Sequence, residues 1–203
     1  MKLRQKIANL IKSPKPIIST PKYEFGSPVP APPEVKRRTI FDYAKVNKID
    51  TLIETGTFRG DTVQAALPLF SSIFSIEVDS TLAEQAKKRF QDQDKVKIIY
   101  GDSGKVLSEI LVSLNKQAVF WLDGHYSGGI TGKGSKNTPI LEELKNILRH
   151  PIKDHVILID DARCFTGEFD YPTLFEIYEM VKAIDSKYQL NVKDDIIRII
   201  YVV

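Results

Sequence analysis

Residues 51–62 read T-L-I-E-T-G-T-F-R-G-D-T, and this stretch decides the fold. It begins apolar, Gly56 and Gly60 then allow a tight turn, and Asp61 and Thr62 suit a helix N-terminus. A strand, a tight loop and the start of a helix therefore follow one another within a few residues. In open α/β sheets such a loop lies outside the carboxyl end of the first strand, where nucleotide-like ligands bind. The stretch predicts an α/β domain with a ligand site at this edge of its sheet.

Strands and helices are expected to alternate along most of the remaining chain. The expected strands are 51–54, 72–78, 96–100, 118–122, 156–159, 188–192 and 196–202, and the expected helices are 35–47, 61–68, 81–91, 106–114, 138–149 and 174–184. This alternation predicts a Rossmann-like, seven-stranded, mainly parallel sheet with helices on both faces. Only a short turn joins the last two strands, so they are expected to form a C-terminal antiparallel hairpin.

Charge is unevenly distributed along the 203 residues, whose net charge is +3. Residues 1–38 hold nine Lys or Arg and two Glu, which leaves a net −4 on the remainder. Seven of the eleven prolines fall within residues 13–34. We therefore expect a basic, proline-rich N-terminal arm over residues 1–34 and one globular domain over residues 35–203.

Cellular location and partners are suggested by the same features. No apolar run approaches the ~20 residues that span a bilayer, and a single cysteine, Cys164, is typical of a reducing cytoplasm. Residues 1–12 place four apolar side chains on one helical face among basic residues. This segment is expected either to pack on its own domain or to touch an anionic membrane surface weakly. The arm could also reach a second subunit, so a homodimer is one expectation.

Acidic residues stand at the expected carboxyl ends of the first three strands. Glu54 ends the first strand and is expected to face the loop. Glu77, about 20 positions after the glycine loop, suits binding of ribose hydroxyls, whereas Asp79 is better suited to capping the next helix. Asp102 and Ser103 follow the third strand, where they could bond an adenine edge or cap a helix.

Three further aspartates follow the fourth and fifth strands. Asp123 comes directly after a buried run, and Asp160 and Asp161 come after the next one. Three carboxylates at neighbouring strand ends repel one another unless a cation or a proton lies between them. Oxygen ligands with one nearby histidine, His125, favour Mg²⁺, Mn²⁺ or Ca²⁺ over zinc. The alternative is that one aspartate caps a helix and the others are solvated.

Two predictions concern exposure. Lys36, Arg37 and Arg38 are expected on the exposed side of the first helix of the domain. His150 and His155, which flank the approach to the fifth strand, are expected at the surface.

Taken together, five motifs resemble the class I S-adenosylmethionine-dependent methyltransferases. The motifs are E-T-G-T-F-R-G (54–60), S-I-E-V-D (75–79), G-D-S (101–103), W-L-D-G-H (121–125) and I-D-D (159–161). They look closest to the metal-dependent, macrocin O-methyltransferase-like enzymes that act on sugars. The resemblance covers about residues 45–203 and rests on the order and spacing of the motifs. One departure is Phe58, which stands where the widest form of the loop has a third glycine.

The resemblance implies a set of site residues. For S-adenosyl-L-methionine it implies contacts from Glu54, Thr55, Gly56, Thr57, Gly60, Glu77, Asp102, Ser103 and Asp123. For a divalent metal, Mg²⁺ above all, it implies the ligands Asp123, Asp160 and Asp161. It also implies catalytic roles for Asp123 and for His125, which falls where sugar-modifying relatives carry a general base.

The implied reaction is methyl transfer to a hydroxyl of a small, sugar-like acceptor. The cofactor's sulfonium already activates the methyl group, so the protein must position the acceptor and remove its proton. A divalent ion would lower the hydroxyl pKa, and His125 would take the proton. The glycine-rich residues 126–137 are interpreted as a lid that selects the acceptor, with Arg163, Asp170 and Tyr171 as further walls.

Three alternatives use the same residues differently. A cofactor-binding scaffold would bind the cofactor and assemble through its arm without catalysis. A hydroxylase-like relative of the same fold would bind iron, but a second nearby histidine is not seen in the sequence. A nucleic-acid methyltransferase would fit the basic arm, but the fourth strand lacks an N-P-P-Y-like motif and the domain has no basic face. No nucleic-acid partner is therefore expected.

Overall fold

A computed structural model describes residues 29–124 and 138–202 of the chain. In chain order its elements are α2 (Pro33–Asn47), β1 (Thr51–Thr55), α3 (Asp61–Ala66), β2 (Ser72–Glu77), α4 (Ser80–Arg89), β3 (Val96–Tyr100), α5 (Ser103–Ser113), β4 (Val119–Leu122), α6 (Ile140–Arg149), β5 (Val156–Ile159), the 3₁₀ turn η1 (Ala162–Cys164), α7 (Leu174–Ile184), β6 (Tyr188–Lys193) and β7 (Ile196–Tyr201). The predicted arm up to residue 28, the predicted lid 126–137 and the predicted base His125 lie outside the described residues. In the described ranges no helix combines the length and the apolar character needed to cross a membrane.

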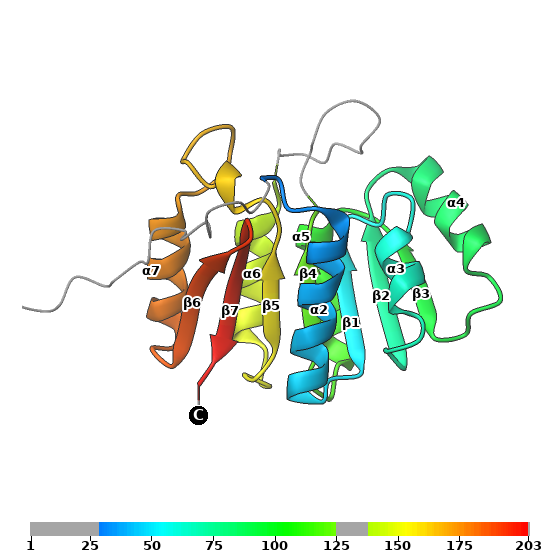
Figure 1. Cartoon of the computed structure of the whole chain (residues 1–203), viewed down its shortest axis with the longest axis horizontal. Helices are drawn as coiled ribbons and strands as arrows, with labels where there is room; N and C mark the ends of the chain where they lie inside the picture. The colour runs from blue at the N-terminus through cyan, green and yellow to red at the C-terminus, as the bar shows by residue number, and fades with distance from the viewer. Residues whose placement is uncertain (1–28, 125–137, 203) are drawn as a thin grey trace, which may run out of the picture.

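The seven strands form one sheet in the order β3-β2-β1-β4-β5-β7-β6. The first five strands in this order pair in parallel, whereas β7 pairs antiparallel with both β5 and β6. The mainly parallel sheet with a C-terminal antiparallel hairpin is therefore confirmed (Figure 1).

Helices cover both faces of the sheet, as predicted (Figure 1). Leu52 of β1 and Trp121 of β4 pack into the core beneath α2, α3 and the end of α4. Ile53 follows Leu52 in β1, and Phe120 precedes Trp121 in β4. Both side chains therefore point to the other face of the sheet, where they pack into a second core with α5, α6 and α7. Because both faces are covered, these strands are buried along their whole length, which explains their nearly continuous apolar sequences.

Several helix boundaries differ from the prediction by one to three residues, and the start of α6 is one of them. The helix predicted over residues 138–149 begins at Ile140 in the structure, and Pro139 occupies its cap position. The Thr138 hydroxyl still accepts a hydrogen bond from the Ile140 amide at 3.3 Å. The Thr138 hydroxyl therefore satisfies an amide of the first turn of α6 from the residue before the cap position.

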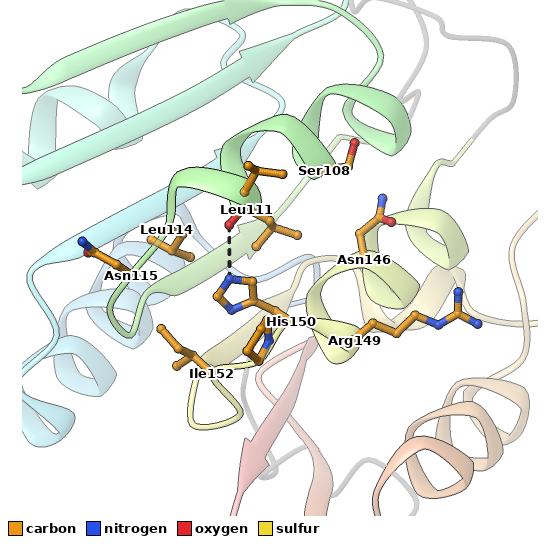
Figure 2. A pocket seen from close by; sticks show the side chains of 10 residues that line it. Ser108, Leu111, Leu114, Asn115, Asn146, Arg149, His150 and Ile152 are labelled. Atoms are coloured by element: carbon orange, nitrogen blue, oxygen red, sulfur yellow. Dashed lines mark hydrogen bonds between the residues drawn. The ribbon is translucent and has the colours of Figure 1, made fainter.

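The prediction that His150 and His155 lie at the surface is wrong, because both are buried. The Ala118 amide donates to His155 Nδ1 (3.1 Å), and His155 Nε2 lies 2.9 Å from His150 Nδ1. His150 Nε2 in turn lies 3.2 Å from the Leu111 carbonyl oxygen (Figure 2). An amide can only donate and a carbonyl can only accept, so this chain of bonds requires both rings to be neutral.

A pocket of about 540 Å³ opens beside the histidine pair, between α5 and α6 (Figure 2). Pro151 and Ile152 line it, and they precede β5. The pocket therefore lies at the amino ends of the parallel strands. The predicted site residues stand at the opposite, carboxyl ends of these strands.

The buried histidine pair makes stability depend on pH. Burial, followed by the proximity of the second imidazole, His150, lowers the pKa of His155 to about 4. A depressed folded-state pKa means stability that is present above the unfolded pKa of about 6.5 and lost as the pH falls towards about 4. Between about pH 7.5 and about pH 4.5, the wild type is expected to lose about 2–3 kcal/mol more unfolding free energy than His155→Asn. Urea unfolding at both pH values measures this difference, and parallel losses in the two proteins would refute it.

Candidate functional site

The register of the central strands places three predicted site residues in one row. The Asp123 amide donates to the Thr55 carbonyl oxygen at 3.1 Å, which continues the β1–β4 ladder past Leu122. The Asp160 amide donates to the Leu122 carbonyl oxygen at 3.1 Å, which continues the β4–β5 ladder past Ile159. Thr55 is level with Leu122 and Ile159, so the residues that follow them, Gly56, Asp123 and Asp160, stand side by side at the carboxyl edge of the sheet.

The loop after β1 makes the tight turn that the sequence predicts. Gly56 has a φ of 86°, and its amide donates to the Ile76 carbonyl oxygen at 2.9 Å. A Cβ atom at this position would clash with the carbonyl oxygen of Asp123. Glycine is thus required both for its backbone conformation and for the close approach of the β1 loop to the end of β4.

Gly60 serves a different purpose in the same loop. It has a φ of 76° at the N-cap of α3, and a Cβ atom there would lie 2.7 Å from Cε2 of Phe90. The neighbouring Asp61 carboxylate accepts a bond from Arg89 at 2.9 Å. These contacts show that Gly60 allows α3 to pack against the end of α4.

Glu77 fastens this loop to the end of β2. Its Oε2 accepts a hydrogen bond from the Phe58 amide (2.7 Å) and its Oε1 accepts one from the Asp79 amide (3.0 Å). A carboxylate oxygen has two lone pairs, so both oxygens can accept a further donor. Asp79 caps α4 by accepting from the Leu82 amide at 2.9 Å, which confirms the predicted helix cap.

Glu54 lies beneath the loop rather than on its open side. The residue is buried, and its Oε2 accepts a bond from Ser75 Oγ at 2.7 Å. Ser75 Oγ also bonds the Thr57 hydroxyl at 2.6 Å. Burial raises the pKa of Glu54 to about 8, helped by the charge of Glu77 and opposed by hydrogen bonds from Ser75 and Thr62. The side chain therefore supports the loop from inside the sheet.

Two hydroxyls converge between the ends of β1 and β4. The Thr55 hydroxyl is buried and has no hydrogen-bond partner in the part of the chain that the structure describes. A Cβ atom at Gly124 would lie 3.1 Å from that oxygen and 3.4 Å from Ser103 Oγ. The bare backbone at Gly124 leaves a small polar cradle. Asp102, next to Ser103, caps α5 by accepting from the Gly104 amide at 3.1 Å.

A lysine lies among the three aspartates that the sequence predicts as metal ligands. Lys36 Nζ bonds Asp160 Oδ2 and lies 3.7 Å from Asp161 Oδ1. Burial opposes its charge, but the negative charges of Asp160, Asp123 and Asp161 raise the pKa of Lys36. The prediction that Lys36 is exposed is therefore wrong, since only 22% of its side chain is accessible.

A second cation braces the segment that follows β5. Arg163 bonds Asp161 Oδ1 at 2.7 Å and also pairs with the carboxylate of Asp195, whose Oδ1 accepts from the Arg163 amide at 2.8 Å. Asp195 is fully buried in the turn between β6 and β7. Sequence reasoning treated that turn only as a connection and missed this residue. Arg163, predicted as a wall of the acceptor site, is engaged in ion pairs with Asp161 and Asp195.

The predicted metal centre does not fit this arrangement. In residues 29–124 and 138–202, no group of three or more His, Cys, Asp or Glu side chains is placed to hold a metal ion. Asp123, Asp160 and Asp161 do gather at one edge, but the cation beside them is Lys36. Mg²⁺ at these ligands therefore stays a prediction that the described residues do not support.

Tyr171, a predicted wall of the acceptor site, lies near the same cluster. Its ring packs edge-to-face on Phe165 with centroids 5.4 Å apart. Burial raises the pKa of its phenol, as do the nearby charges of Cys164, Asp161 and Asp123. A phenol group thus borders the acidic edge on the side of η1.

Solved structures with a similar fold include several methyltransferases. The O-methyltransferase TomG from Streptomyces achromogenes, in complex with SAM, is 15% identical over 86% of this chain and 83% of its own, with a TM-score of 0.60. An O-methyltransferase from Bacillus cereus with SAH is 14% identical over 86% of this chain and 84% of its own, with a TM-score of 0.61. The SAH-bound Podospora anserina methyltransferase PaMTH1 is 16% identical over 83% of this chain and 79% of its own, with a TM-score of 0.59.

Sequence comparison gives a weaker relation. No family model matches the chain. A probable ribosomal RNA small subunit methyltransferase A from Methanococcoides burtonii is 28% identical over 95 residues, which cover 43% of this chain. The match spans only 35% of that curated relative. The comparisons establish the Rossmann-like fold of the S-adenosylmethionine-dependent methyltransferases.

Because Gly56 contacts Asp123 so closely, adding a single methyl group at Gly56 is predicted to lower the unfolding free energy strongly. Gly56→Ala combines a disfavoured positive φ with a clash against backbone, so it is expected to lower the unfolding free energy by at least about 3 kcal/mol. Gly167→Ala is the matched control, because its φ is 87° and the added Cβ would meet only a side-chain methyl of Thr173 at 3.0 Å. That control is expected to cost about 1–2 kcal/mol. Equal costs in urea unfolding would contradict the packing described.

Proposed function

We propose that this protein is an S-adenosylmethionine-dependent methyltransferase that modifies a hydroxyl of a small, sugar-like acceptor. The observation that carries the proposal is the meeting of the Gly56 loop, the Glu77 carboxylate and the Thr55–Ser103 cradle at one edge of the sheet. The structural neighbours that carry SAM or SAH support the cofactor, and their O-methyltransferase members support a hydroxyl acceptor.

The residues at this edge fit the cofactor's chemistry. The buried Glu77 carboxylate holds the loop and still has lone pairs for ribose hydroxyls. Ser103, and Asp102 beside it, would lie on the adenine side, and the Thr55–Thr57 segment would hold the methionine part. The orphaned Thr55 hydroxyl gives that segment a donor or acceptor that a polar ligand would satisfy.

Catalysis then requires the chain to orient the acceptor and accept its proton. When bound, the cofactor supplies an electrophilic methyl group, and the acceptor oxygen gives up a proton as its new bond to carbon forms. Asp123 stands at the end of β4 beside the cradle, where it would orient the acceptor hydroxyl. His125, two residues later, is proposed as the base. The nearby positive charge of Lys36 would favour the deprotonated oxygen.

Methylation of RNA is a second candidate, which the ribosomal RNA methyltransferase relative favours. It requires a base to be presented at the same edge, beside Asp123. The W-L-D-G-H sequence that ends β4 differs from the N-P-P-Y-like motif expected of such enzymes. Transfer of labelled methyl groups from the cofactor to a panel of sugars and catechols, and in parallel to small-subunit ribosomal RNA, separates the two. We expect incorporation into a small hydroxyl acceptor, and labelling of RNA alone would refute that choice.

Cofactor binding tests the site itself. S-Adenosylhomocysteine is expected to bind the wild type with a micromolar Kd in calorimetric titration. Glu77→Gln is expected to weaken binding about 10-fold to 100-fold, because it removes a charged acceptor from both the ribose side and the loop. Glu84→Gln on the exposed surface of α4 is the control and is expected to bind like the wild type.

Absence of cofactor binding by the folded wild-type protein would contradict the proposed function. Binding without transfer to any acceptor, with no loss of affinity in Asp123→Asn, would favour the non-catalytic scaffold.

A further inference from the structure

Three carboxylates lie at the carboxyl edge of the sheet, and a cation from another part of the same chain balances their charge. The Asp160 side chain is fully buried and its Oδ1 has no hydrogen-bond partner among residues 29–124 and 138–202. Asp161 follows it directly, and Asp123 stands at the end of the neighbouring strand. Two adjacent buried carboxylates, with a half-buried third at the end of the next strand, require a compensating positive charge.

The compensating charge comes from α2, an element outside the part of the chain that carries the sequence motifs. The first turn of α2 is anchored where the Pro32 carbonyl oxygen accepts from the Lys36 amide at 3.1 Å. Ile40 and Ala44, four and eight residues after Lys36, are buried against the sheet. Helical spacing therefore directs Lys36 inwards, at the end of α2 that lies beside the carboxyl edge (Figure 1).

We propose that Lys36 is the resident cation of the Asp123–Asp160–Asp161 cluster and takes the place of a divalent metal there. Oxygen ligands hold Mg²⁺ or Ca²⁺ at about 2.0–2.6 Å. An ion bound that closely to Asp160 and Asp161 would have to displace the ammonium, which bonds one carboxylate and lies 3.7 Å from the other. Arg163 holds the outer side of Asp161 at 2.7 Å, which further reduces the charge available to a metal.

A lysine at this position also has a chemical use. An ammonium carries three N–H donors, and those not turned to the carboxylates can reach an acceptor oxygen. Lys36 would then orient the acceptor hydroxyl and stabilise its developing negative charge, as a metal ion does in other enzymes. This last role rests on the proposed function, whereas the replacement of the metal does not.

Titration with Mn²⁺ alone, followed by electron paramagnetic resonance on the full chain, tests the replacement. The wild type is expected to show no saturable site that depends on Asp160. Lys36→Met keeps the length of the side chain and removes its charge, so it is expected to bind Mn²⁺ at least about tenfold more tightly than the wild type. Adding Asp160→Asn to Lys36→Met is expected to abolish the new site.

Two matched variants separate charge from position. Lys36→Arg keeps a cation at the cluster and is expected to behave like the wild type. Arg38→Met removes a cation from the same helix, but from a side chain that is 83% exposed, and is also expected to leave Mn²⁺ binding unchanged.

The wild-type titration is decisive even if Lys36→Met does not fold. A micromolar Mn²⁺ site in the wild type that Asp160→Asn removes would overturn the inference, as would a folded Lys36→Met protein that binds no more tightly than Arg38→Met. The titration contains no cofactor, so its failure is distinguishable from a failure of S-adenosylhomocysteine to bind.

Discussion

The hydrogen-bonded register of β1, β4 and β5 is the constraint on which the site depends. Two ladder bonds, from the Asp123 amide to the carbonyl of Thr55 and from the Asp160 amide to that of Leu122, bring the carboxylates of Asp123 and Asp160 level with Gly56. A shift of one residue in either strand would turn these side chains to the other face. The buried apolar cores on both faces prevent such a shift, so the interior of the sheet fixes the geometry of its edge.

Electrostatic compensation ties distant parts of the chain to that edge. Lys36 connects α2 to the end of β5, and Arg163 connects the residues after β5 to Asp195 in the C-terminal hairpin. Removing one partner of a buried ion pair leaves an uncompensated buried charge. This lowers the folding stability more than replacing both partners by apolar residues does. The helix before the first strand and the hairpin after the last helix are therefore parts of the site, as well as covers for the sheet.

The sequence was sufficient for the fold because its signals are local and repeated. Alternating apolar strands and helices, the Gly56 turn and the short final turn predict the sheet and its antiparallel end. It failed where the answer depends on contacts between distant residues. Nothing near Lys36 shows that it meets Asp160, which lies 124 residues later, and nothing near His155 shows that it is buried against His150. Aspartates that gather at strand ends look the same in sequence whether a metal or a lysine balances them.

The most direct test is a crystal structure of the protein grown with S-adenosylhomocysteine and Mn²⁺, with anomalous diffraction measured at the manganese edge. We predict density for the cofactor product between the Gly56 loop, Glu77 and Ser103, with the Lys36 ammonium bonded to Asp160 and no anomalous peak beside it. A manganese peak between Asp123 and Asp160 with Lys36 turned away would contradict the account of the cation. Absence of cofactor density at this edge at saturating S-adenosylhomocysteine would contradict the proposed cofactor site.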